Sequence, residues 1–164
     1  MTPPDAPSPV FWSPHWHAFF TGFFTEQRTA VLATAREDQP YCSLMAFAWL
    51  DGDPRQLVMA SPSHSEKMTN IEHNPKVSLL IDSSRNAPED SHTAKAVTVL
   101  GTARLCPAGD QDRAADALCE RHPHLASFVQ DPGTALLCVN AHRLLLVEHF
   151  QDVTLIETGI TDHE

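Results

Sequence analysis

The sequence has little positive charge, because eleven lysine and arginine residues stand against twenty-one acidic residues in a chain of 164. No basic cluster interrupts this excess, so the electrostatic signature of nucleic-acid or anionic-membrane binding is missing. The longest apolar runs, such as AFFTGFF, are far shorter than a membrane span. We therefore expect neither a nucleic-acid partner nor a membrane segment.

Several chemical signatures are also missing. The four cysteines form no CxxC pair, and the first ten residues lack the pattern of a secretory signal. We therefore expect a cytoplasmic protein with reduced, mostly buried thiols at Cys42, Cys106, Cys119 and Cys138. Ten histidines occur without an HExxH motif, and no Walker, Rossmann or G-x-S-x-G motif is present. These absences predict no metal site and no identifiable nucleophile.

The length suits one domain. Residues 1–13 contain four prolines and are expected to form an irregular arm, which leaves 14–164 as the single domain. In the segment 14–27, Ser13 and Pro14 predict a helix start. Five aromatic residues then share one helical face that we expect to pack on the core: Trp16, Phe19, Phe20, Phe23 and Phe24.

The rest of the pattern is mainly β. Residues 28–61 predict a three-stranded antiparallel meander, and further strands are expected at 76–81, at 95–105 and after residue 134. Gly101 indicates a bulge or bend within its strand. Two short helices are expected on either side of Pro123. About six strands with flanking helices predict an antiparallel barrel or sheet of the α+β type.

The segment SPSHSEK, residues 61–67, opens a short predicted helix. Ser63 and Glu66 have the spacing of a capping box, in which each side chain bonds the other residue's amide. That motif leaves Ser65 and Lys67 unexplained, and a lysine in the first turn of a helix is mildly unfavourable. An anion at this helix end would reverse the cost, so the segment is a candidate phosphate site.

Three stretches in order resemble the pyridoxamine 5′-phosphate oxidase-like family of FMN-binding split barrels. They are QPYCSLMAFAWLDG, then LVMASPSHSEKMTNIEHNPKVSLLI, then AVTVLGTARL, and the resemblance covers residues 29–105. It implies a mainly β, Greek-key split barrel with flanking helices. It also implies cofactor contacts along the flavin ring from Ser43, Leu44, Met45 and Ala46. Ala60 and Ser61 would border the ribityl chain and phosphate, and Ser65 and Lys67 would hold the phosphate.

The sequence also departs from the family pattern. Glu66 stands where the family has an arginine, and Arg85 or Lys95 is the candidate to supply the missing charge across a dimer interface. Ala96 and Ser43 replace a glutamine and an arginine of the true oxidases, and no R-x-H follows near the C-terminus. We therefore expect a relative that does not oxidise pyridoxamine phosphate. In the polar loop after residue 81, Arg85 and Asn86 are expected to face a flavin phosphate or a substrate.

The resemblance implies a homodimer with FMN at the subunit interface. The expected activity is that of an oxidoreductase passing hydride or electrons through the flavin to a small acceptor. One alternative is a haem-binding or haem-degrading protein, with His64, His149 or His163 as the axial ligand. Two others are a non-catalytic flavin carrier and an interaction protein that has lost its cofactor. No catalytic residue can be named from the sequence.

Overall fold

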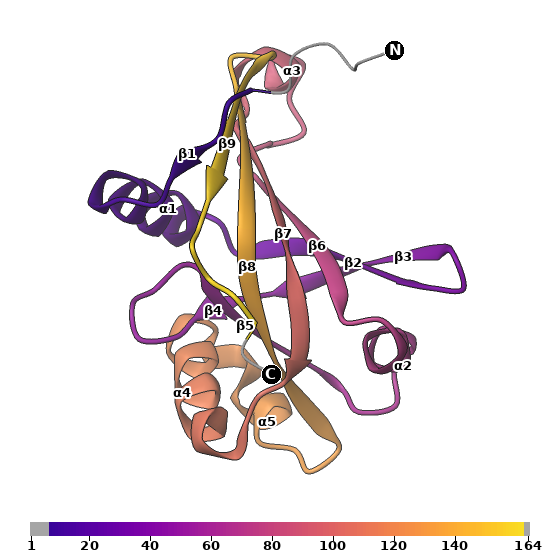
Figure 1. Cartoon of the computed structure of the whole chain (residues 1–164). Coiled ribbons are helices and arrows are strands. Elements are labelled where there is room, and N and C mark those ends of the chain that lie inside the picture. The colour runs from indigo at the N-terminus through magenta and orange to yellow at the C-terminus, as the bar shows by residue number, and fades with distance from the viewer. Residues whose placement is uncertain (1–6, 163–164) are drawn as a thin grey trace.

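The computed structural model describes residues 7–162, whose strands form one sheet with helices around it (Figure 1). The strands are β1 (Val10–Phe11), β2 (Thr29–Arg36), β3 (Gln39–Ala46), β4 (Ala48–Trp49), β5 (Gln56–Pro62), β6 (Lys76–Asp82), β7 (Ala96–Leu105), β8 (Thr134–Glu148) and β9 (Asp152–Glu157). The helices are α1 (Pro14–Glu26), α2 (Glu66–His73), α3 (Asp90–Thr93), α4 (Gln111–Arg121) and α5 (Ala126–Val129). Short 3₁₀ turns lie at Ala108–Asp110 and Pro123–Leu125.

Strand β8 organises the sheet. One of its edges pairs with β7, while the other pairs first with β5 and then, beyond a break, with β9. The sheet therefore divides along β8, and its main path runs β1-β9-β8-β7-β6-β2-β3. All pairs are antiparallel except β1 with β9. The expected mainly β, split-barrel architecture with flanking helices is confirmed, with nine strands rather than about six.

Two local predictions need correction. The meander expected over 28–61 is only partly right, because its middle strand divides into β3 and the short β4, and β5 pairs with β4 and β8 but has no ladder to β3. The arm expected at 1–13 is not wholly irregular, since β1 adds to the edge of β9. Residues 1–6 of that arm lie outside the described residues.

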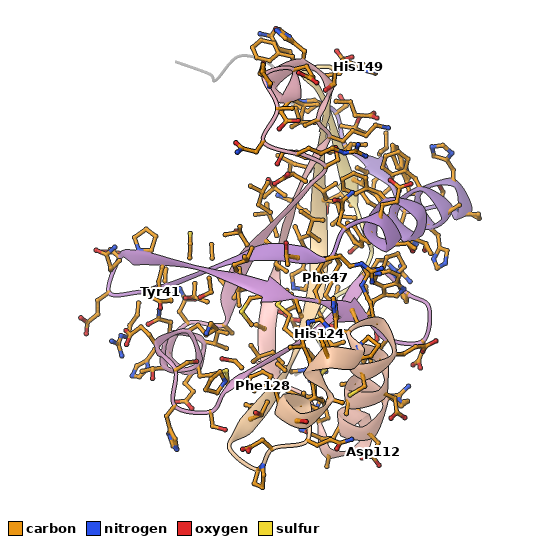
Figure 2. All side chains as sticks on the ribbon, turned by 180° about the vertical axis from the view of Figure 1, so that it is seen from behind. Tyr41, Phe47, Asp112, His124, Phe128 and His149 are labelled. Carbon is orange, nitrogen blue, oxygen red and sulfur yellow. A yellow bond between two sulfur atoms is a disulfide. The ribbon has the colours of Figure 1, made fainter. Side chains whose placement is uncertain are left out.

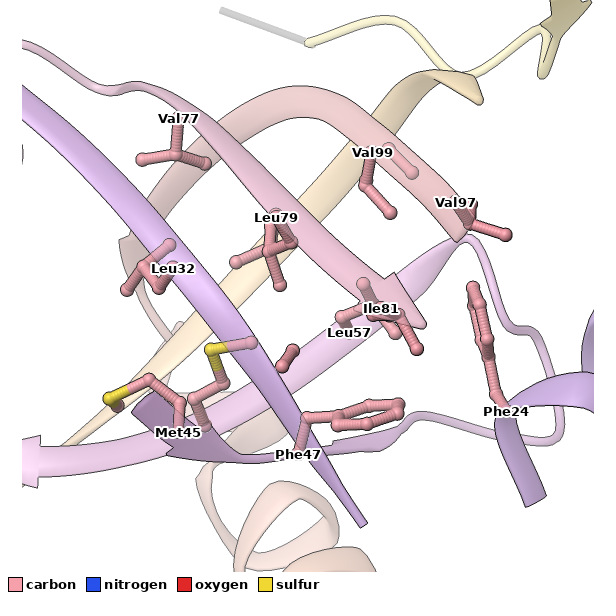
Figure 3. Packing of buried hydrophobic residues seen from close by; sticks show 14 of the residues in the cluster. Phe24, Leu32, Met45, Phe47, Leu57, Val77, Leu79, Ile81, Val97 and Val99 are labelled. Atoms are coloured by element: carbon pink, nitrogen blue, oxygen red, sulfur yellow. The ribbon is translucent and has the colours of Figure 1, made fainter. Parts of the chain in front are cut away.

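Helix α1 forms as the sequence predicts. Ser13 is its N-cap and accepts a hydrogen bond from the Trp16 amide, and Pro14 occupies the first helical position. The apolar face buries Phe20, Phe23 and Phe24 completely or nearly so. Phe24 meets the ring of Phe47 edge-on at 5.8 Å between centroids, inside a core that also contains side chains of β2, β3, β5, β6 and β7 (Figure 3).

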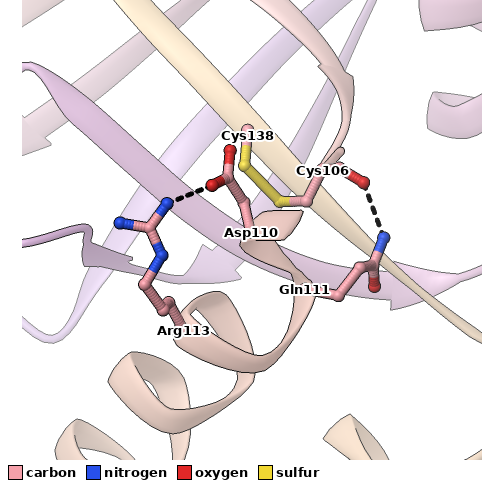
Figure 4. The surroundings of a disulfide bond; sticks show 5 residues. All are labelled: Cys106, Asp110, Gln111, Arg113 and Cys138. Atoms are coloured by element: carbon pink, nitrogen blue, oxygen red, sulfur yellow. Dashed lines mark hydrogen bonds and ion pairs between the residues drawn. A yellow bond between two sulfur atoms is a disulfide. The ribbon is translucent and has the colours of Figure 1, made fainter. Parts of the chain in front are cut away.

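A second, smaller core lies under α4 and α5 and contains a disulfide between Cys106 and Cys138 (Figure 4). The two Cα atoms are 4.9 Å apart, and the bridge joins the segment after β7 to β8. Gln111 at the start of α4 donates to the Cys106 carbonyl at 2.6 Å. The expectation of four reduced thiols is therefore wrong for this pair, while Cys42 and Cys119 are free.

Arg121, the last residue of α4, connects this helix to the main core. Its guanidinium stacks on the rings of Phe47 and Trp49, 5.1 and 4.7 Å from their centroids, and donates to the carbonyls of Phe24 and Gln27 at the end of α1. The Phe24 carbonyl also accepts from the Gln27 amide at 3.2 Å, and Gln27 is the C-cap, so the arginine adds a side-chain donor at the end of α1. Burial lowers the pKa of Arg121.

Replacing Arg121 by alanine is expected to lower the free energy of unfolding by about 2 kcal/mol, because charge-assisted bonds and ring contacts are lost together. Urea denaturation followed by tryptophan fluorescence measures the change. The matched control is Arg104→Ala, an exposed arginine whose loss should stay within about 0.5 kcal/mol. Equal midpoints for the two variants would contradict the assigned role of Arg121.

No helix in residues 7–162 has the length and apolarity needed to cross a membrane.

Candidate functional site

The opening of α2 differs from the expected capping box. Ser65, not Ser63, is the N-cap, and its side chain makes no capping bond. Ser63 instead donates through both its amide and its hydroxyl to the Gly133 carbonyl, each at 2.8 Å. Glu66 accepts from Arg36 of β2 at 2.9 Å. The capping-box prediction is therefore wrong, and the amides of the first helical turn have no side-chain acceptor.

Three predicted phosphate residues do meet at this helix end. The hydroxyls of Ser61 and Ser65 lie 2.9 Å apart, and the Lys67 ammonium donates to Ser61 Oγ at 3.3 Å. Ser61 is buried at the end of β5, and Lys67 is the second residue of α2. Strand β5 and the helix are joined by a tight turn in which the Ser65 amide donates to the Pro62 carbonyl at 3.1 Å. The turn places the two hydroxyls and the amine on one side of the chain.

Lys67 is a partly buried cation without an acidic partner in the described part of the chain. Burial lowers the pKa of its ammonium group. Within residues 7–162, none of the ion pairs involves Lys67. The nearest acidic neighbour in sequence, Glu66, is held by Arg36. The helix start thus presents a desolvated positive charge, two hydroxyls and free amides, which together match a phosphate group.

Lys67 also lines a cavity of about 290 Å³. Four residues that the sequence analysis assigned to the flavin border the same space: Leu44, Met45 and Ala46 of β3, and Ala60 of β5. Segments distant in sequence are therefore brought together as the family resemblance implies. Ser43 lies on β3 beside them, partly buried, with its Cα opposite that of Leu32 of β2.

The opposite wall of the cavity was not predicted. It is apolar and comes from the helical segment after β7, as Leu118 of α4, Leu125 of the following turn and Phe128 of α5. Figure 2 labels Phe128 in this segment. The sequence predicted two short helices on either side of Pro123, but that prediction carries no signal of which strand the helices face. Pro62 completes the lining.

Arg85 and Asn86 lie elsewhere. They belong to the loop between β6 and α3, whereas α2 adjoins the opposite end of β6 (Figure 1). The Arg85 amide donates to Asp90 at 2.9 Å, and Asn86 has a left-handed backbone with φ of 59°. Within one chain these residues do not join the cavity. Lys95, the other candidate for the missing charge, pairs with Glu148 at 3.0 Å.

Neither His64 nor His149, two of the three histidines considered as haem ligands, lines the cavity. His64 is exposed in the turn before α2, His149 is exposed after β8, and His163 lies outside the described residues. No histidine from the described part of the chain lines the 290 Å³ cavity. No group of three or more potential metal ligands among His, Cys, Asp and Glu occurs within residues 7–162.

The chain matches a model of a known protein family. A family model described as pyridoxamine 5′-phosphate oxidase matches residues 17–148. No curated protein matches the chain.

Solved structures share the fold at low sequence identity. A haem-binding protein from Mycobacterium smegmatis is 16% identical with a TM-score of 0.75, and the match covers 90% of this chain but only 63% of that one. General stress protein 26 from Bacillus anthracis is 24% identical with a TM-score of 0.64, over 87% and 98% of the two chains. An FAD-binding protein from Mesorhizobium loti is 21% identical with a TM-score of 0.61, over 77% and 88%.

Proposed function

Because the chain belongs to the pyridoxamine 5′-phosphate oxidase family, we propose that it binds FMN, with the phosphate on Ser65 and Lys67. The observation that most supports this proposal is the state of Lys67. It is a partly desolvated cation without a carboxylate partner in the described chain. It lies at a helix start where two serine hydroxyls converge. A phosphate dianion would supply that partner and accept from the free amides. The ribityl chain would pass Ala60 and Ser61.

The flavin ring would lie along β3. Leu44, Met45 and Ala46 border the cavity on one side, and the apolar wall from α4 and α5 borders it on the other. Leu44 is 73% exposed, so one protomer leaves much of the ring uncovered. We therefore propose a homodimer in which a second copy covers the flavin at the interface. The exposed β3 edge and the exposed Leu80 on the outer sheet face support this arrangement.

The proposed activity is that of an oxidoreductase acting on a small acceptor. Bound FMN supplies hydride or electron transfer, with a reduced nicotinamide or another donor as its reductant. Apart from Lys67, the residues bordering the cavity are apolar, so their task is to position the ring and exclude water. The replacements Ser43 and Ala96 argue against pyridoxamine phosphate as the substrate. Neither His64 nor His149 lines the cavity, which favours FMN over haem.

Anaerobic mixing of the FMN-loaded protein with NADH or NADPH tests the redox part of the proposal. Bleaching of the visible flavin band, followed by its return with oxygen, is the expected result. Bound FMN that stays oxidised with both donors would identify a flavin carrier instead. A protein that takes up no FMN would favour the interaction protein without a cofactor.

Replacing Glu66 by arginine is expected to tighten FMN binding by about 1 kcal/mol, roughly fivefold, because it adds a cation beside the phosphate. The Arg36–Glu66 pair is half-exposed, so its loss should change stability little. Glu66→Gln, which only removes the negative charge, should give a smaller gain. Fluorescence titration with FMN and riboflavin measures both, and an equal gain for riboflavin would contradict a phosphate effect.

A further inference from the structure

A second hollow, of about 770 Å³, lies on the outer face of the sheet, away from the proposed flavin site. Its floor consists of small and apolar residues of β2, β6 and β7, among them Ala33, Ala35 and Gly101. Its charged or titratable lining within residues 7–162 is Lys76, His142, Arg143 and a single carboxylate, that of Asp162. Asp162 is thus the point at which the C-terminal segment closes one side of this groove.

The C-terminal segment is anchored firmly up to Thr158. This residue is 1% exposed, its amide donates to the His142 carbonyl at 3.0 Å, and its hydroxyl donates to the Ala141 carbonyl at 2.6 Å. Arg55 donates to the Thr158 carbonyl at 3.0 Å. Gly159 follows with φ of +77°, a left-handed conformation that turns the chain back over the sheet. Residues 159–162 therefore form a short strap hinged on a fixed point.

Two of the contacts that hold this strap come from one histidine side chain, and the Ile160 amide also donates to Thr158 Oγ1 at 3.2 Å. His142 Nδ1 lies 2.9 Å from the Ile160 carbonyl oxygen, and Nε2 lies 3.2 Å from Asp162 Oδ2. Thr102 donates to the other carboxylate oxygen at 2.7 Å, and Asn140 lies 3.4 Å from that same oxygen. His142 reaches this position because it is the extra residue of a β-bulge, where Leu100 pairs with Arg143 and Gly101 pairs with Ala141.

Counting protons shows which form of the imidazole fits. Both ring nitrogens face acceptors, a carbonyl and a carboxylate, and only the imidazolium has a hydrogen on each nitrogen. In the neutral form with hydrogen on Nδ1, the lone pair of Nε2 faces the carboxylate. Thr102 has one hydroxyl hydrogen, so donating it to Nε2, 3.2 Å away, would take it from Asp162. One contact to the strap is lost in either case.

We propose that residues 159–162 are a proton-dependent strap, closed over the edge of the outer groove when His142 is protonated and released when it is neutral. Closure is then favoured at low pH and release at high pH. Since one proton is linked to closure, the ratio of closed to open strap changes by at most about tenfold for each pH unit.

The other charged groups around the strap keep their charge over the pH range of interest, so they do not account for pH-dependent closure. Lys76 of β6 and Arg143 of β8 line the groove, and Arg143 is paired with Glu157 of β9 at 2.7 Å. Arg104 of β7 borders the adjacent hollow together with Asp162. Lysine and arginine keep their charge through this pH range. The Thr102 hydroxyl, together with Asn140 and His142, lowers the pKa of Asp162, so the carboxylate stays ionised.

NMR relaxation on the full-length protein tests the strap. The heteronuclear NOE of the Ile160 and Asp162 amides should be that of ordered backbone at about pH 5.5 and should fall at about pH 8.5. Thr158 should stay ordered at both values. A strap that is equally ordered at both pH values, or equally mobile at both, would overturn the proposal.

The Asp162→Asn variant distinguishes the His142–Asp162 contact from general effects of pH on the strap. It removes the carboxylate that needs the imidazolium, so the pH dependence of the strap should disappear while the fold is kept. The matched control is Asp152→Asn, which alters an exposed aspartate 3.4 Å from His149 and should leave the strap's pH dependence unchanged. A pH dependence that persists in Asp162→Asn would show that another group drives it. FMN affinity is not a readout here, so this test stands apart from the flavin proposal.

Discussion

Replacing Lys67 by alanine is expected to weaken FMN binding by about 1.5–3 kcal/mol, which corresponds to roughly 10- to 150-fold in affinity. The ammonium group is partly buried and donates only to Ser61 in the described chain, so in the proposed complex it is the main cation on the phosphate. Riboflavin, which has the same ring but no phosphate, should bind the variant and the natural protein equally. Fluorescence titration of both ligands measures the two effects.

The control for this change is Lys95→Ala. Lys95 is also a partly exposed lysine, but it pairs with Glu148 and lies outside the cavity. Its replacement should leave FMN affinity unchanged if each protomer supplies its own phosphate cation. Equal losses in the two lysine variants would mean that the effect is one of net charge. A Lys67 variant that loses riboflavin affinity as strongly as FMN affinity would place the phosphate elsewhere.

Replacing Gly101 by alanine is expected to destabilise the fold by about 3 kcal/mol, the upper end of what overpacking usually costs. A Cβ at this position would lie 2.1 Å from the backbone oxygen of Asn140, and backbone atoms in the middle of β8 cannot move aside easily. The close approach arises from the bulge that places His142 on the outer face. Chemical denaturation measures the loss of stability.

Gly22→Ala is the matched control for Gly101. Gly22 lies within α1, and a Cβ there meets no atom within 4 Å. Alanine favours the helix over glycine, so this variant should be more stable by about 0.5–1 kcal/mol. Two variants that share one chemical change should therefore move stability in opposite directions. A neutral Gly101→Ala variant would contradict the close packing of β7 on β8.

Local signals in the sequence predicted the local elements well. The cap at Ser13, the proline after it and the aromatic spacing predicted α1. The irregularity expected at Gly101 is present, but the extra residue, His142, belongs to the partner strand β8. Long-range pairing carried no such signal. Strand β5 follows β3 closely in the chain, yet it pairs with β8 more than seventy residues later. Hydrophobic alternation makes a strand, but it does not say which strand will be its neighbour.

In the candidate site, too, the local signals were predictive and the long-range contacts were not. Ser65 and Lys67 were identified because a lysine at a helix start needs an explanation, and the structure brings them to Ser61. The predicted capping box does not form, because both of its side chains bond residues elsewhere in the fold. Gly133 accepts from Ser63, and Arg36 donates to Glu66, from positions 70 and 30 residues away. Such competition appears only when the chain is folded.

The prediction that all four cysteines are reduced was wrong for a similar reason. Cys106 and Cys138 are 32 residues apart in sequence, and no spacing pattern joins them. They meet because β7 and β8 are neighbours and the chain leaves β7 beside the start of β8. In the same region α4 packs against β4 and β5, and α5 packs against β8, so that their apolar residues form one wall of the cavity bordered by β3 and β5.

Calorimetric titration of the natural protein with FMN, and separately with riboflavin, tests the phosphate site most directly. We predict saturable binding of one FMN per chain, with riboflavin weaker by about 1.5–3 kcal/mol because it lacks the phosphate that Lys67 and Ser65 hold. Equal affinity for the two ligands, or no binding of FMN, would contradict the assignment of this helix start as the phosphate site.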